Sequence, residues 1–319
     1  MKTATYLILF IVFSGIFFSC ADRSSDPLIP PKTPTEVSGI VSGIWAQDDS
    51  PIIVTGDVQV PANQTLSIEP GTLIQFENGF RMTVNGQLDA IGTDREPIRF
   101  TAADVHWRGI HIVDATGSSS LKFCQISGGG SDAQLDSTGN GILEVRNSTA
   151  DIRNSVFTGN NGFTGGGIAA LNGAIITVKN CIFYQNQSLV YGGGMFVMAS
   201  QATIINNTFY KNNSDNVGGG LVLFNPISVE IQNNIFYQND APQGLKTIYF
   251  ARPDSGVALI QYNFTDLALN PAFIDEGNLH ISAGSPCQNA GNPDPAFNDV
   301  DLTRNDQGAF GGPGGDWNP

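Results

Sequence analysis

A ten-residue segment recurs four times along the chain at a nearly constant spacing. The four copies begin at Asp151, Thr177, Thr203 and Glu230, so that successive starts lie 26, 26 and 27 residues apart. A second marker, a glycine followed by an apolar residue, keeps the same step at Gly141, Gly167, Gly194 and Gly220. Two markers in phase predict a solenoid in which each copy is one coil.

A period of this length is compatible with a leucine-rich repeat or with a parallel β-helix. No copy shows the L-x-x-L-x-L frame of leucine-rich repeats. The residues between the markers, such as 168–178, form two short apolar runs around a glycine and lack helical periodicity. The sequence therefore predicts an all-β fold, a parallel β-helix with coils of about 26 residues.

Equivalent residues of successive coils in such a fold stack about 4.8 Å apart. The repeats then predict an internal aromatic stack of Phe157, Phe183, Phe209 and Phe236. They also predict a ladder of side-chain amides at one turn, formed by Asn160, Asn186, Asn212 and Asn239.

The cysteines and the net charge limit the classes of protein. Cys124 and Cys181 occupy one repeat position two coils apart, about 9.6 Å by the inter-strand spacing, which is too far for a disulfide. We expect both to be buried as small hydrophobic residues. The formal net charge of −14 argues against nucleic acid as a partner.

The N-terminus has the features of an export signal. Lys2 precedes an apolar run over 6–18 that is shorter than the roughly 20 residues of a membrane-spanning helix. The run ends at Ser19-Cys20, which resembles a bacterial lipoprotein signal with Cys20 as the lipidated mature N-terminus. A cysteine in a discarded signal peptide is the alternative. Residues 21–37 are rich in Pro, Ser and Thr, as in an extended tether.

These features divide the chain into four parts. We expect a signal peptide over 1–19, a lipid-anchor cysteine and tether over 20–37, a β-helix over 38–268 and an irregular C-terminal cap over 269–319. The expected location is a bacterial membrane, as an exported protein on the outer membrane or cell surface that contacts the membrane through its lipid alone.

Several segments carry a family resemblance. Ile53-VTGDV, Leu66-SIEPGTLIQF, Val84-NGQLDAIGT and Trp107-RGIHI look like the opening coils of bacterial surface lipoproteins with right-handed parallel β-helix repeats, in the pectate-lyase-like superfamily. Asn270-PAFID and Gly284-SPCQNAGNPDP are similar to their closing segment. The resemblance implies a right-handed β-helix, but this superfamily holds lyases, hydrolases, epimerases and non-enzymatic binders.

Pectin-type glycoside hydrolases of this fold use clustered aspartates and a Gly-His-Gly segment, and this sequence has neither. None of the three histidines, His106, His111 and His280, is flanked by glycine on both sides, and the repeats hold no Asp-Asp pair. His106 and His111 are an odd number of residues apart, so on one strand they would point to opposite faces and share no metal. Inverting hydrolysis and a zinc site are therefore disfavoured.

Lys122, Arg153 and Lys179 all fall at the third position of the repeat and should stack as a basic column. Such a column would serve as base and charge neutraliser in a polysaccharide lyase acting on a uronate, or would bind an anionic glycan. The alternative is an exposed face that neighbours such as Asp151 neutralise.

A second column consists of tyrosines. Tyr184, Tyr210 and Tyr237 each follow an internal phenylalanine and are therefore expected to point outward. Stacked outward rings can bind the faces of sugars. They can also shield the surface of the coil.

The C-terminal segment carries closely spaced carboxylates at Asp294, Asp299, Asp301 and Asp306. Their spacing lacks the EF-hand order, so the sequence leaves two interpretations open, a calcium site and a solvated acidic cap.

Two functions remain compatible with these patterns. The first is a surface module that binds a polysaccharide or serves adhesion or display without chemistry. The second is a polysaccharide lyase that acts on an acidic, uronate-containing glycan by β-elimination. The first is favoured, because the only support for an enzyme is the resemblance in fold.

Overall fold

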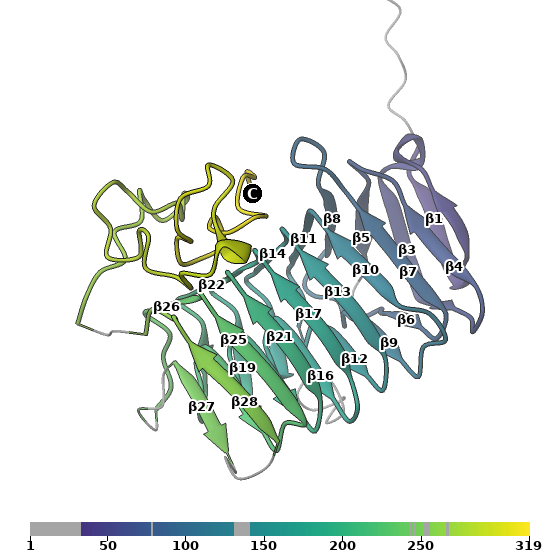
Figure 1. The fold of residues 1–319 in the computed structure, drawn as a ribbon. Coiled ribbons are helices and arrows are strands. Elements are labelled where there is room, and N and C mark those ends of the chain that lie inside the picture. The colour runs from purple at the N-terminus through teal and green to yellow at the C-terminus, as the bar shows by residue number, and fades with distance from the viewer. Residues whose placement is uncertain are drawn as a thin grey trace, which may run out of the picture. The chain divides into compact units, whose positions relative to one another are not determined.

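The computed structural model describes residues 33–77, 79–130, 141–242, 244, 247–251, 256–265 and 268–319. Every strand pair in this part of the chain is parallel, and neighbouring strands in each sheet belong to successive coils (Figure 1). The predicted all-β parallel β-helix is therefore confirmed. None of the helices in the described residues has the length and apolar character that crossing a membrane requires.

The largest sheet, sheet A, forms two flanks of the solenoid that share one bent strand. The first flank consists of β3 (Ile52–Val60), β5 (Leu73–Phe76), β8 (Ile98–Ala102), β11 (Cys124–Ser127), β14 (Val156–Thr158), β18 (Ile182–Tyr184), β22 (Thr208–Tyr210) and β26 (Ile235–Tyr237). The second flank continues from β3 through β6 (Met82–Val84), β9 (Ile110–Val113), β12 (Leu143–Arg146), β16 (Ile168–Leu171), β20 (Met195–Met198), β24 (Leu221–Phe224) and β27 (Ile248–Ala251). β1 (Thr35–Ile40) pairs with β3.

Sheet B closes the coil on its remaining long side. It consists of β2 (Gly43–Trp45), β4 (Thr65–Ile68), β7 (Gln87–Ile91), β10 (Ser119–Lys122), β13 (Thr149–Arg153), β17 (Ile175–Lys179), β21 (Gln201–Ile205), β25 (Ser228–Gln232) and β28 (Val257–Gln261). A small third sheet joins β15 (Asn161–Thr164), β19 (Gln187–Tyr191) and β23 (Asn213–Ser214). Two short 3-10 helices are η1 (Gln47–Asp49) and η2 (Pro295–Phe297).

The predicted phenylalanine stack fills the interior behind the first flank. The rings of Phe157, Phe183, Phe209 and Phe236 lie 5.1, 4.5 and 4.6 Å apart between successive centroids and are nearly parallel. All four side chains are fully buried. Since each ring lies over the next, the stack joins the coils through a continuous apolar core.

The predicted asparagine ladder is also present. The side-chain amide of Asn160 donates to Oδ1 of Asn186, Asn186 donates to Asn212, and Asn212 donates to Asn239, at 2.9 to 3.0 Å. Each amide nitrogen also donates to a backbone carbonyl one coil back, as Asn186 does to Phe157 at 2.8 Å. A second ladder, which the sequence analysis did not predict, runs through Asn207, Asn234 and Asn263.

Cys124 and Cys181 are buried free thiols, as expected. Burial raises the pKa of the Cys181 thiol to about 12 and shifts the pKa of Cys124 upward as well. Neither thiol is therefore a ready nucleophile at neutral pH.

Both thiols are expected to resist a maleimide reagent at pH 8 in the native protein, because the thiolate is disfavoured and the sulfurs are covered. Mass spectrometry of labelled peptides checks this. In guanidinium chloride both peptides should label within minutes. Labelling of Cys181 in the native protein, faster than global unfolding, would contradict the burial described here.

The C-terminal segment 269–319, which we call the strap, lies along the side of the solenoid. The strap contacts strands of the first flank from several coils (Figure 1). β28, in the last coil, leaves Val257 71 % exposed. The strap therefore packs against the first flank and leaves at least part of β28 exposed.

A third column of asparagines holds the strap. Asn154, Asn180, Asn206 and Asn233 each occupy the turn after sheet B with a positive φ between 48° and 59°. Asn154 donates to the carbonyl of Gly314, Asn180 to Gly311 and Asn206 to Asp306, at 2.7 to 2.9 Å. Asparagine tolerates this left-handed backbone conformation. The conformation points the side-chain amides outward, where they form hydrogen bonds with backbone groups of the strap.

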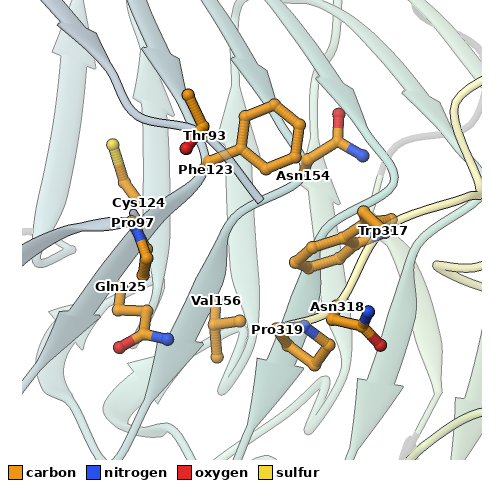
Figure 2. Close-up of a pocket in the computed structure, with 10 residues that line it drawn as sticks. All are labelled: Thr93, Pro97, Phe123, Cys124, Gln125, Asn154, Val156, Trp317, Asn318 and Pro319. Carbon is orange, nitrogen blue, oxygen red and sulfur yellow. The ribbon is translucent and has the colours of Figure 1, made fainter. Parts of the chain in front are cut away.

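Apolar contacts complete the docking. Trp317 is 4 % exposed and clusters with Ile182, Leu279 and Ala309. Its ring faces the edge of Phe123 with 6.4 Å between centroids (Figure 2). The cavity drawn in Figure 2 has a volume of about 10 Å³, so at most one water fits there. This end of the strap is therefore packed against the coil.

Candidate functional site

The outer face of sheet B carries mainly small polar and charged side chains. One column in register contains Ser67, Asp89, Ser120, Asp151, Thr177, Thr203 and Glu230. All of these side chains are partly exposed. The face thus presents hydroxyl and carboxylate groups on a regular pleated surface.

The basic column lies beside this polar column. Lys122 is in register with Arg153, and Arg153 is in register with Lys179, on β10, β13 and β17. The preceding and following positions are Ile91 and Ile205. The sequence prediction that these three cations stack is confirmed.

One carboxylate is shared by two of the three cations. Arg153 Nε donates to Asp151 Oδ1 at 2.8 Å and to Oδ2 at 3.0 Å, and Lys122 Nζ lies 3.6 Å from Oδ2. Lys179 forms no ion pair with any described residue. Asp151 therefore offsets part of the positive charge, and the column keeps an excess of cations.

The tyrosine column stacks as predicted but is not an open platform. Tyr184, Tyr210 and Tyr237 lie 5.5 and 5.8 Å apart between centroids. Tyr210 is only 5 % exposed, because Phe273 and other strap residues pack on it. The expectation of outward rings free to receive sugars is therefore wrong for Tyr210, since residues distant in sequence cover it.

The four aspartates predicted for calcium all make hydrogen bonds within the strap. Asp294 accepts from the backbone of Ala296, Asp301 from Thr303 and Asp306 from Asn289. Asp299 accepts from the backbone N–H groups of Asp306 and Gly312. Burial raises the pKa of the Asp299 and Asp306 carboxyls. These contacts give the carboxylates a role in the strap's turns.

The structure brings three of these aspartates together. Asp299, Asp301 and Asp306 line one open hollow of about 530 Å³, while Asp294 caps η2 elsewhere. Among the described residues, no three or more His, Cys, Asp or Glu side chains have an arrangement that could hold a metal ion. Calcium binding stays a prediction.

The second flank carries a buried charged cluster that was not predicted from the sequence. On the outer side of the second flank, Glu144 is 2 % exposed, and its Oε1 lies 2.7 Å from Arg146. His111 Nδ1 lies 3.8 Å from Glu144 Oε2, and its Nε2 lies 2.7 Å from the carbonyl of Arg108. The sequence signal is a charged side chain in register with His111 on an outward position. A buried carboxylate of this kind needs such partners.

The predicted lipidation site, Cys20, lies outside the described residues, as do the signal peptide and most of the tether.

Comparison with curated proteins and with solved structures found no match. A family model described as a right handed beta helix region matches residues 96–266. This range exceeds half of the 319 residues and contains the four regular repeats. The chain therefore belongs to the right-handed β-helix family.

Proposed function

We propose that this protein is a bacterial surface lipoprotein that binds an acidic polysaccharide through the outer face of sheet B. The observation that carries the proposal is the column of Lys122, Arg153 and Lys179 beside the single carboxylate of Asp151. Cations that face solvent in a row attract a ligand with carboxylates or sulfates along its length. In this proposal Cys20 carries the lipid, and the residues between Cys20 and the start of β1 at Thr35 hold the β-helix away from the membrane.

The resemblance to pectate-lyase-like proteins adds a second candidate, a polysaccharide lyase. β-Elimination needs a base and a cation that neutralises the uronate carboxylate, and the same column contains lysine and arginine side chains. Binding is favoured, because Arg153 and Lys122 are engaged by Asp151 and are placed to act as cations.

The double variant Lys122→Gln/Lys179→Gln is expected to bind acidic glycans about tenfold more weakly, since two partly exposed charge contacts together contribute about 1.4 kcal/mol. Affinity electrophoresis of the purified protein in gels containing alginate, pectate or glucuronoxylan measures the change. A concurrent ultraviolet trace detects unsaturated elimination products.

The matched control is Arg95→Gln/Arg99→Gln, which removes the same charge from two exposed arginines outside sheet B. Its retardation should equal that of the unmodified protein. Equal weakening in both double variants would mean that net charge alone governs binding. A growing ultraviolet signal that Lys122→Gln/Lys179→Gln abolishes would replace the binding proposal with the lyase.

A further inference from the structure

Unequal turn lengths create a hollow at the corner between the second flank and sheet B. Five residues, 114–118, join β9 to β10, whereas two residues, 147–148, join β12 to β13 in the next coil. The tip of the long turn bonds residues of the preceding coils, while the Ala115 N–H donates to Ser148 Oγ of the next coil at 2.9 Å. The Thr116 N–H donates to the carbonyl of Asn85 at 2.9 Å, and Thr116 Oγ1 accepts from the N–H of Asn63 at 2.8 Å. The space left on its other side is a cavity of about 330 Å³, which we call the corner pocket.

The lining of the corner pocket is neutral and rich in hydroxyl groups. The hydroxyls of Ser118 and Thr149 are exposed and form no hydrogen bond with any described residue. Asn147 donates its amide to Asp114 at 2.8 Å, which leaves its Oδ1 as an acceptor. Ile175, which is 47 % exposed, adds an apolar surface. A few polar groups around an apolar wall suit a ligand with both characters, such as a sugar ring.

Glycine keeps the pocket open at its far side. Gly173 has a φ of +89°, and a Cβ built there would lie 3.5 Å from Asn147 Oδ1. A larger side chain at this position would therefore be strained and would occupy space beside the acceptor.

One strand connects the corner pocket to the basic column. Thr149, Asp151 and Arg153 alternate along β13 and share its outer face, while Ala150 and Ile152 are buried in the interior. Thr149 lines the pocket, and Arg153 belongs to the column. Four residues of a strand span about 13 Å, so a single oligosaccharide can reach both.

We infer that the corner pocket is a subsite for a neutral sugar ring of the same acidic glycan whose uronate lies on the basic column. The inference rests on the proposed function and fixes the direction of the ligand. The glycan crosses sheet B along its strands, whereas a path along the solenoid axis over both columns would meet Tyr210 under the strap.

The test uses two series of oligosaccharides that contain both acidic and neutral sugars. They are glucuronoxylan fragments with one glucuronate, and hyaluronan oligomers, each from two to six sugar units. Isothermal titration of the full protein is expected to show affinity rising about tenfold along at least one series, which corresponds to about 1.4 kcal/mol. The variant Ser118→Ala/Thr149→Val should remove this rise and leave binding of the disaccharide unchanged.

The matched control is Thr203→Val, which removes a hydroxyl from the same face of sheet B two coils farther along. It should keep the dependence on length. If Ser118→Ala/Thr149→Val keeps the rise while Lys122→Gln/Lys179→Gln loses binding, the pocket is not a subsite and the proposed function stands. If neither series binds, or if binding does not strengthen with length, the subsite is overturned, while the gels containing alginate, pectate or glucuronoxylan decide the proposed function separately.

Discussion

Replacing Asn212 with alanine is expected to lower the free energy of unfolding by about 3–6 kcal/mol, since it leaves several buried polar groups without partners. Asn212 Oδ1 accepts from both the backbone N–H and the side-chain amide of Asn186, each at 3.0 Å. Its own amide donates to the carbonyl of Phe183 at 2.8 Å and to Asn239 at 2.9 Å. Alanine removes all four bonds in the middle of the ladder, where Asn212 is fully buried.

Guanidinium denaturation followed by circular dichroism measures the effect. Asn161→Ala is the matched control, because Asn161 is exposed in the same region and its side chain bonds no described residue. The control should change stability by less than about 0.5 kcal/mol, as for most surface substitutions. Equal midpoints for the two variants would show that the ladder does not stabilise the solenoid.

The interior of the solenoid could be predicted in detail, because residues that align between repeats of the sequence also lie next to each other in the fold. Phe183 is in register with Phe209, as its repeat position predicts, and the ladder from Asn160 to Asn239 follows the same rule. A period of 26 or 27 residues therefore determines neighbours directly. The basic column followed from the same reasoning.

The outer surface could be predicted only in part. The alternation that buries Phe209 correctly turns Tyr210 outward, but nothing periodic announces that Phe273 lies against it with 5.4 Å between ring centroids. The strap has no repeat, and its hydrogen bonds with the asparagine column go mainly to backbone carbonyls, which every sequence has. The asparagines at the turn, such as Asn180, carry a signal, yet a preference for left-handed turns explains them equally well.

The corner pocket was missed for a related reason. It arises from the difference between the turns 114–118 and 147–148, and neither turn carries a motif. Columns of equivalent residues report what neighbouring coils share, whereas a hollow forms where they differ. Sites on a solenoid should therefore be sought at irregular turns as well as along regular columns.

The strap should loosen when one of its anchoring amides is removed. Asn206→Gly deletes the hydrogen bonds to the carbonyls of Asp306 and Gly308, at 2.9 and 3.2 Å. It also deletes the hydrogen bond to the side-chain oxygen of Asn305. Glycine accepts the φ of 54° at this position, so the change isolates the side chain. The free energy of opening the strap is expected to fall by about 3 kcal/mol, because buried acceptors lose their donors.

Hydrogen exchange resolves this opening from global unfolding. The Gly308 N–H, bonded to the carbonyl of Asn233, and the Ala309 N–H, bonded to Thr208 Oγ1, should exchange about 100-fold faster, as expected for a loss near 3 kcal/mol. Amides beside the phenylalanine stack should keep their protection. The control is Asn225→Gly. Asn225 lies in another turn with the same left-handed backbone conformation, a φ of 50°, and its side chain is exposed. Equal exchange at Gly308 in both variants would mean that the asparagine column does not hold the strap.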